Sequence, residues 1–201
     1  MEKVKLYLMD YHKIIDNYEL YLNKLTEERK NKALRYVNDS DKYKSILAST
    51  MIDKFTLGEL KYNEHKKPYK DLKPYFNVSH SKDYVIIGLS SFEIGVDIEY
   101  IKEFDQKLLN YTLSDIELSH YKEEKDFYLM WTSKESLVKC KGIGLIKNLK
   151  TIEALPLNGK KIDEDTFYSK SFIYDNNAVS VTIKSDSDFD IEFKVLDELS
   201  V

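Results

Sequence analysis

The sequence predicts an α+β fold made of two halves of similar size. A run with helical spacing is followed by three short β-rich segments, and a second helical run is followed by further strand-like segments. Hydrophobic residues make up 42% of the 201 residues, which is enough to bury a sizeable core. We therefore expect an N-terminal half over residues 1–93 and a C-terminal half over residues 94–201.

The N-terminal half begins with VKLYLMD (residues 4–10), whose alternation predicts a strand. Helical spacing follows over residues 17–37, and a second helix is expected within residues 39–60, with Ser40 or Asp41 as N-cap and Gly58 near its end. The polar, proline-containing residues 61–74 are expected to form a loop. YFNVSH, YVIIGLS and IGVDIEYI then predict an antiparallel meander, because hairpin-length turns separate them.

The C-terminal half begins with the last strand of that meander. Helical spacing covers residues 105–141, with a break expected near Thr112–Ser114, and Gly142 and Gly144 are expected to end the helix. SFIYD, AVSVTIK and DIEFKVL predict three further strands.

Composition narrows the class of protein. The formal net charge is -4, from 31 basic and 35 acidic side chains, which argues against general nucleic-acid binding. The single cysteine, Cys140, excludes an intramolecular disulfide and a cysteine-rich metal site. Charges interrupt the N-terminal segment, and no stretch approaches the roughly 18 apolar residues of a membrane span. We expect a soluble, cytoplasmic protein that contacts no membrane.

Two carboxylates stand out within the apolar stretch FEIGVDIEYI. On a strand, Val96 and Ile98 would face the core, whereas Asp97 and Glu99 would share the opposite face. One interpretation is a half-exposed strand whose acidic face is solvated. The other is a site where two carboxylates converge on a ligand.

The helical segment WTSKESLVK supplies a possible partner for these acids. Glu135 and Lys139 are four residues apart and share a helix face, which could mean only a surface ion pair. In the functional interpretation, Glu135 completes a three-carboxylate cage with Asp97 and Glu99, and Lys139 binds an anion beside it. Oxygen ligands without cysteine or histidine favour Mg²⁺, which takes much of its remaining shell from substrate phosphates. The pattern therefore indicates a pyrophosphate-bearing substrate.

Candidate phosphate donors lie upstream. FNVSHS lacks the G-x-S-x-G pattern of a hydrolase elbow, so a serine-hydrolase interpretation is rejected. Ser79 and His80 could instead donate to phosphate, although a hydrogen-bonded structural histidine is an alternative. Solvated helix faces and loops could equally explain the remaining candidates. These are Arg29, Lys32, Lys44, Ser45, Lys67 and Pro68.

FNVSHS, IGVDIE and WTSKESLVK, in this order, resemble the 4′-phosphopantetheinyl transferases of the surfactin-synthetase-associated (Sfp-like) type. The resemblance runs from about Thr26 to Leu145. It departs from the family pattern at two positions: Lys44 stands where arginine is usual, and Lys66 stands where glycine is usual in G-K-P. Both concern nucleotide contacts and leave the acidic motifs intact.

The resemblance implies two pseudo-twofold α+β halves with the site between them, in a monomeric enzyme. The implied reaction is Mg²⁺-dependent transfer of the 4′-phosphopantetheine arm of coenzyme A to a serine of an acyl or peptidyl carrier protein, with release of adenosine 3′,5′-bisphosphate. Asp97, Glu99 and Glu135 would hold the metal, and Glu135 and Lys139 would be catalytic. Contacts to coenzyme A would come from Lys139 and from the residues named above.

By the same analogy, the carrier protein would dock on residues 104–125. Leu108, Leu109, Tyr111 and Leu113 are candidates there, but they could also form the core of a helix. Two other functions remain open: a Mg²⁺-dependent phosphodiester hydrolase, and a non-catalytic module that binds coenzyme A or a carrier protein.

Overall fold

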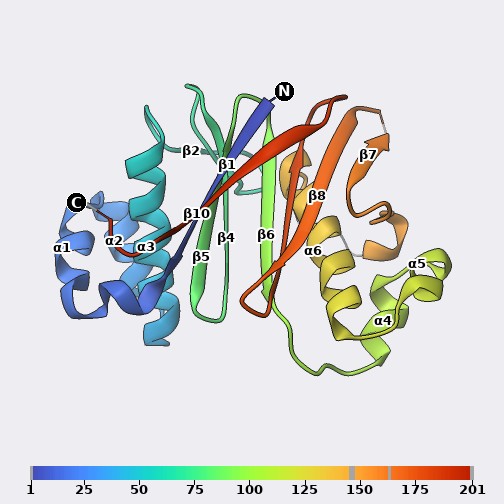
Figure 1. The fold of residues 1–201 in the computed structure, drawn as a ribbon. Helices are drawn as coiled ribbons and strands as arrows, with labels where there is room; N and C mark the ends of the chain where they lie inside the picture. Colours follow the sequence, from blue (N-terminus) through green and yellow to red (C-terminus); the bar gives the residue numbers. More distant parts are fainter. Residues whose placement is uncertain (1, 145–147, 163, 200–201) are drawn as a thin grey trace.

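The computed structural model describes residues 2–144, 148–162 and 164–199. Two four-stranded sheets stand side by side in the centre, and helices cover the outer side of each (Figure 1). The N-terminal sheet has the order β10-β1-β5-β4, and the C-terminal sheet has the order β6-β9-β8-β7. This arrangement confirms the predicted α+β class.

The strands of the N-terminal sheet are β1 (Glu2–Asp10), β4 (Tyr75–Ser81), β5 (Tyr84–Ser90) and β10 (Phe189–Leu196). Those of the C-terminal sheet are β6 (Ile94–Tyr100), β7 (Gly159–Ile162), β8 (Thr166–Tyr174) and β9 (Asn177–Ile183). A small ribbon of β2 (Lys61–Tyr62) and β3 (Pro68–Tyr69) lies within the segment that was expected to be a loop.

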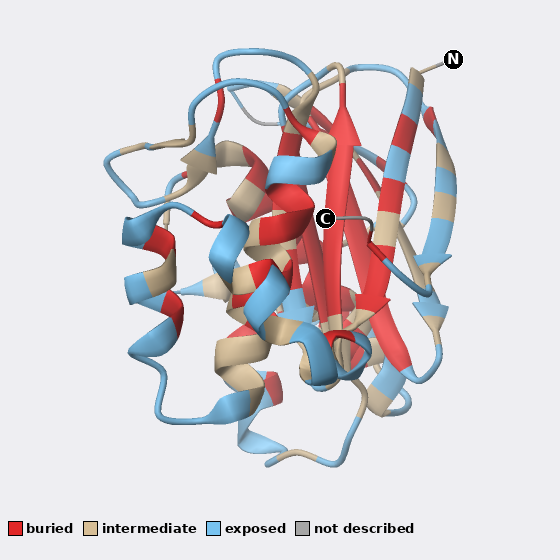
Figure 2. Cartoon of the chain, turned by 90° about the vertical axis from the view of Figure 1, so that its left-hand side faces the viewer, coloured by how far each residue is buried: buried red, intermediate tan, exposed pale blue. Residues whose placement is uncertain are grey.

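Alternating side chains build the core between the two sheets. In β1, Val4, Leu6 and Leu8 pack with Val96 and Ile98 of β6 in one fully buried cluster. Odd-numbered residues of β1 contribute to a second cluster beneath the N-terminal helices. Figure 2 shows the buried strands behind helices whose outer surfaces are exposed. The period-two pattern of the sequence therefore places the N-terminal sheet between two apolar layers.

The helices of the N-terminal half differ in detail from those expected. The predicted helix over residues 17–37 is divided into α1 (Tyr18–Lys24) and α2 (Glu27–Leu34), because Leu25 adopts an extended backbone. A 3-10 helix, η1 (Tyr11–Asn17), precedes α1. The second helix is α3 (Asp39–Phe55). Its N-cap is Asn38, not Ser40 or Asp41, since the Asn38 side chain accepts from the Ser40 amide at 3.0 Å.

The predicted three-stranded meander is wrong at its last step. β5 pairs with β4 on one edge and with β1 on the other, so β6 has no free edge of β5 to join. It pairs with β9 and becomes the edge strand of the other sheet. β4 and β6 are thus edge strands of different sheets that lie close to each other.

The C-terminal strand crosses back to the first sheet. β10 pairs in parallel with β1, and the Tyr21 hydroxyl donates to the Leu199 carbonyl at 3.2 Å. The expected half over residues 94–201 therefore gives its last strand to the sheet of the N-terminal half.

The helices of the C-terminal half are α4 (Lys107–Thr112), α5 (Asp115–His120) and α6 (Glu124–Lys141). The expected break near Thr112–Ser114 is confirmed, and a second break separates α5 from α6. Gly142 ends α6 in the left-handed conformation, with φ 67°, as expected for a C-terminal glycine. A short 3-10 turn, η2 (Leu149–Thr151), precedes β7.

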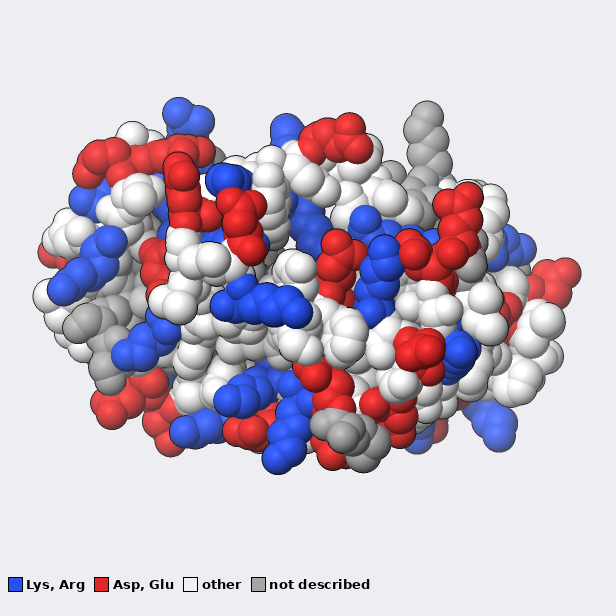
Figure 3. All heavy atoms as spheres, turned by 90° about the horizontal axis from the view of Figure 1, so that it is seen from above, with Lys and Arg blue, Asp and Glu red and all other residues white. Residues whose placement is uncertain are grey.

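Two general surface properties follow. Over the ranges that the structure describes, no helix combines the length and the apolarity needed to cross a bilayer. Basic and acidic side chains are interspersed on the face seen in Figure 3, so that face presents no broad field of one sign.

Candidate active site

The site forms where β4, β6 and helix α6 meet. Gly95 allows α6 to lie directly against β6, because a Cβ at that position would be 2.0 Å from the Ser136 carbonyl oxygen and 2.3 Å from the Cys140 nitrogen. No side chain fits at that distance. The glycine two residues before Asp97 thus fixes the distance between the acidic strand and the helix.

Asp97 is the centre of the site. It is buried, and its Oδ1 accepts from the Lys139 Nζ at 2.5 Å and from the Ser79 hydroxyl at 2.8 Å. Lys139 also donates to the Ser79 Oγ at 2.9 Å. Three separate elements, β4, β6 and α6, thereby place one basic group, one acidic group and one hydroxyl in mutual contact.

The other oxygen of Asp97 has no such partner. Asp97 Oδ2 is buried and, among the described residues, receives no hydrogen bond. A buried carboxylate oxygen without a donor is costly, because it has lost its water and gained nothing in return. A hydrogen-bond donor or a cation at this atom would offset that cost.

Two further carboxylates approach this centre. Burial and the negative charge of Asp97 raise the pKa of Glu99, whose Oε2 accepts from the Ser81 hydroxyl at 2.8 Å. Burial and the same negative charge raise the pKa of Glu135, and Lys139 opposes that rise. The negative charge of Asp97 therefore acts on both glutamates, and the charge of Glu135 also acts on Glu99.

The described residues do not form the closed three-carboxylate cage that was expected from the sequence. Among the described residues, no group of three or more histidine, cysteine, aspartate or glutamate side chains is arranged to hold a metal ion. The physical reason is that Lys139 reaches Asp97 and supplies the cation there. The residues still fit a divalent ion in kind, since oxygen donors, the unpartnered Asp97 Oδ2 and the repelled Glu99 and Glu135 all favour positive charge.

A row of polar side chains on β4 joins the two sheets, and the sequence interpretation assigned it no such role. Asn77 Oδ1 accepts from the Val96 amide at 2.8 Å, Ser79 donates to Asp97, and Ser81 donates to Glu99. The signal was present, because Asn77, Ser79 and Ser81 alternate with Val78 and His80 and so share one face.

A cavity of about 280 Å³ opens beside this centre. It is lined by Lys139 and Glu135 from α6, by Asn77 from β4, and by Lys67 and Pro68 from the β2–β3 segment. Lys66 also lines it and adopts φ 64°, in the left-handed region that glycine occupies freely. This conformation explains why a glycine at the position of Lys66 would be favourable.

The comparisons with known proteins agree with this geometry. Residues 93–188, which contain Asp97, Glu99, Glu135 and Lys139, match the model of the 4′-phosphopantetheinyl transferase superfamily. The similarity of the chain to this superfamily therefore includes the acidic strand and the helix that form the site. The match confirms the family and the enzyme class that the motifs predicted.

Several relatives carry the corresponding name. The chain is 29% identical over 168 residues to the 4′-phosphopantetheinyl transferase gsp of Aneurinibacillus migulanus, covering 76% of this chain and 67% of that protein. It is 30% identical over 138 residues to ffp of Bacillus subtilis, and 28% identical over 144 residues to Sfp of Bacillus subtilis strain 168. The last two alignments cover 60% and 63% of this chain, and 62% and 64% of those proteins, which is less than two thirds of their length.

Of the predicted phosphate donors, Ser79 makes hydrogen bonds within this centre, and His80 lies within the influence of its charges. The Ser79 hydroxyl donates a hydrogen bond to Asp97. Ser79 therefore holds the acidic strand in place and is not a free donor for phosphate. Surrounding atoms desolvate His80 and, together with the charges of Lys44 and Lys139, lower its pKa. These causes all disfavour the charged form of the His80 imidazole, whose side chain is exposed at the surface.

Lys67 has a structural contact in addition to its place at the cavity wall. Its Nζ donates to the Cys140 carbonyl at 3.0 Å and to the Ile94 carbonyl at 3.3 Å, and burial lowers its pKa. It therefore ties the β2–β3 segment to the end of α6 and the start of β6.

The other basic candidates are occupied elsewhere. Arg29 is buried and donates to both carboxylate oxygens of Asp53 at 2.7 Å and to the Ser49 carbonyl at 2.6 Å. Lys44 pairs with Asp41 at 2.9 Å, and Lys32 lies over the Tyr62 ring at 6.0 Å. Among the described residues that line the cavity, neither these three nor Ser45 is included. In this structure Arg29 thus joins α2 to α3 and is not an open phosphate donor.

The expected docking segment separates into two groups. Leu109 and Leu113 are buried in the core beneath α4, whereas Leu108 and Tyr111 are exposed.

Cys140 of α6 is also buried, and burial raises the pKa of its thiol to about 12. A nucleophilic role for Cys140 is therefore disfavoured.

Proposed function

We propose that this protein transfers the 4′-phosphopantetheine arm of coenzyme A to a serine of an acyl or peptidyl carrier protein and releases adenosine 3′,5′-bisphosphate. One observation carries the proposal: Lys139, Asp97 and Ser79 meet beside a cavity that Lys139 lines. Asp97 Oδ2 has no partner among the described residues, and Glu99 and Glu135 add negative charge near Asp97. That centre suits a polyanionic substrate together with a divalent cation.

The proposal includes Mg²⁺, held by Asp97, Glu99 and Glu135. When bound, the ion would supply positive charge to the pyrophosphate and polarise its phosphorus. Its binding would also satisfy Asp97 Oδ2 and relieve the repulsion among the three acids. Lys139, which is 29% exposed, would then be free to turn from Asp97 toward the phosphate oxygens.

Lys139 is the group that would neutralise developing charge. In phosphoryl transfer, charge spreads over the phosphate oxygens in the transition state, and catalysis depends mainly on positioning and electrostatics. The Lys139 ammonium lines the cavity and lies one helical turn from Glu135. It can therefore contact the anion without entering the core.

Glu135 is the candidate general base. Burial and the charge of Asp97 raise the pKa of Glu135, which favours proton uptake, whereas a bound cation would oppose that rise. It would take the proton of the attacking serine directly or through a water molecule. The serine oxygen forms the new bond to phosphorus, and the bond from phosphorus to the adenosine bisphosphate breaks.

The carrier protein is proposed to approach over α4 and α5, where Leu108, Tyr111 and Ile116 are exposed. His80 and Lys44 would contact phosphates of coenzyme A, and Lys67 and Pro68 would border its adenine. The enzyme is proposed to act as a monomer.

The direct test is incubation of the protein with coenzyme A, Mg²⁺ and an apo-carrier protein, followed by mass spectrometry of the carrier. We expect the carrier to gain the mass of one phosphopantetheine group. Consumption of coenzyme A without that gain would indicate the phosphodiester hydrolase, and no change in either would indicate the binding module. Several carriers of different pathways should be compared, and a reaction with EDTA serves as the control for the metal.

A further inference from the structure

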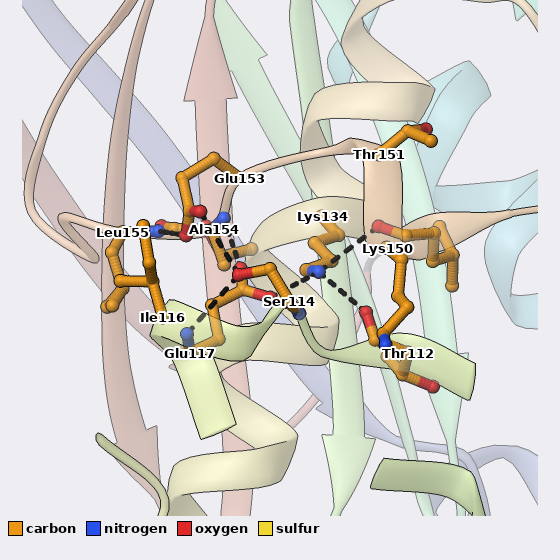
Figure 4. Close-up of polar contacts among 12 residues, drawn as sticks. Thr112, Ser114, Ile116, Glu117, Lys134, Lys150, Thr151, Glu153, Ala154 and Leu155 are labelled. Atoms are coloured by element: carbon orange, nitrogen blue, oxygen red, sulfur yellow. Dashed lines mark hydrogen bonds and ion pairs between the residues drawn. The ribbon is translucent and has the colours of Figure 1, made fainter. Parts of the chain in front are cut away.

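A second lysine of α6 lies outside the candidate active site and is completely buried. Lys134 precedes Glu135, and its Nζ donates to the Glu117 Oε2 at 2.5 Å, the Thr112 carbonyl at 2.6 Å and the Leu149 carbonyl at 3.1 Å (Figure 4). An ammonium group has three protons. All three are therefore donated within the protein.

The partner carboxylate is equally well satisfied. Glu117 is completely buried, its Oε1 accepts from the Ala154 amide at 2.5 Å, and its Oε2 accepts from the Ser114 amide at 2.8 Å as well as from Lys134. The pair thus joins the end of α4, the start of α5, the middle of α6 and the segment after η2. Figure 4 shows these four parts of the chain converging on two side chains.

Stability alone does not account for such a pair. Well-packed apolar side chains of similar volume often stabilise a protein as much as a buried ion pair does. Directional hydrogen bonds add what apolar contacts lack, which is a fixed relative position of the bonded segments. Helices α4 and α5 have six residues each and are too short to be stable by themselves. Their position therefore depends on what holds them against α6.

We propose that Lys134 and Glu117 are positioning residues for the protein acceptor. They hold α4–α5 at one place relative to Glu135 and Lys139, so that the serine of a carrier protein docked on α4–α5 meets the site. This inference rests on the proposed function and on its docking segment. It assigns to the pair a role in acceptor recognition, with little role in coenzyme A binding.

The kinetic test uses Glu117→Gln, which removes the negative charge and keeps the side-chain shape. We expect the KM for the carrier protein to rise roughly tenfold, since mutations in coupling elements change coupling by that order. The Kd for coenzyme A, measured by calorimetry, should change by less than about twofold. A parallel loss of coenzyme A binding would overturn the inference.

Two further variants separate positioning from stability. In the double variant Lys134→Met/Glu117→Leu, removal of both buried charges should recover part of the thermal unfolding temperature that Glu117→Gln loses, but the high KM for the carrier should persist. Val4→Ala, in the core between the sheets, is the matched control that lowers stability at a distance from α4–α5. If Val4→Ala gives the same rise in KM, or the double variant restores it, the pair has only a structural role.

A measurement without catalysis tests the same idea. Hydrogen exchange of the backbone amides of α4 and α5 should become faster in Glu117→Gln, whereas exchange in β9 should not change. An unchanged rate in α4 and α5, or an equal increase throughout the chain, would overturn the positioning role. If the wild-type protein modifies no carrier, the proposed function fails, and the exchange experiment still decides whether the pair holds α4–α5.

Discussion

Helix α6 carries two lysine–carboxylate pairs that are built in opposite ways. Lys134 and Glu117 are completely buried, and each of their donor and acceptor atoms has partners in the protein. Lys139 is 29% exposed, and one buried oxygen of Asp97 has no partner within the part of the chain that the structure describes. The two lysines are five positions apart in the sequence, so the helix presents them to different surroundings.

The difference shows how a fold separates framework from function. A satisfied, closed pair gains nothing from a ligand and keeps its segments in place. In the open pair, the second carboxylate oxygen can still bind a cation, and the partly exposed ammonium group can still bind a phosphate. The open pair also lies at the cavity, whereas Lys134 and Glu117 are not among the described residues that line it.

The largest expected effect comes from a substitution that breaks the open pair. Asp97→Ala removes the carboxylate that contacts Lys139 and the proposed metal, so carrier modification should fall by roughly 10³-fold or more. The mass-shift assay measures this. Thermal unfolding should change little, because Lys139 can turn to solvent and the unpartnered oxygen is removed with the side chain. Asp190→Ala, an exposed residue on β10, is the control, and normal turnover of Asp97→Ala would exclude the proposed chemistry.

Lys139→Ala tests the basic member of the open pair, because it removes the ammonium group and keeps the acidic side chains. We expect kcat to fall by roughly 10²-fold, the size of effect seen when one donor to a developing charge is lost. The Kd for coenzyme A should change much less. Steady-state kinetics together with calorimetry separate the two quantities. A large loss of affinity with a normal kcat would make Lys139 a binding residue only.

Much of the open site could be predicted from sequence because it depends on local periodicity. Alternation placed Asp97 and Glu99 on one face of a strand, and a four-residue spacing placed Glu135 and Lys139 on one face of a helix. The role of Gly95 could not be predicted in the same way, because its close contact with α6 is visible only in the folded structure. The motif order then linked the strand to the helix through a family resemblance.

The parts that could not be predicted depend on contacts between distant segments. β6 leaves β5 because β1 and β4 already occupy both edges of β5, and no local pattern records that competition. β10 returns to β1 for the same kind of reason. Buried Arg29 and Lys134 look like solvated charges in the sequence, since their partners Asp53 and Glu117 are 24 and 17 residues away. Burial of charge is a property of the tertiary structure.

The smallest expected effect tests how the charge of a third buried residue, Lys161, affects stability near the closed pair of Lys134 and Glu117. Lys161 is buried beside it, and its Nζ donates to the Ser133 hydroxyl at 2.5 Å. Burial lowers the pKa of Lys161 to about 8, because the attraction of Glu117, which Lys134 partly opposes, does not offset the loss of hydration. Two buried ammonium groups thus share one buried carboxylate, and the folded state binds the proton of Lys161 weakly.

The sign of the pH effect follows from this shift. Between pH 8 and 10.5 the unfolded chain keeps the Lys161 proton and the folded chain releases it, so the free energy of unfolding rises with pH in that window. From pH 7 to pH 9 the contribution is about 1.4 kcal/mol, one pKa unit's worth of proton binding. Denaturant unfolding of the wild type and of Lys161→Met at both pH values isolates this contribution, because other titrating groups cancel in the difference. Equal pH dependence in the two proteins would show that Lys161 keeps an ordinary pKa and that the closed centre tolerates its charge.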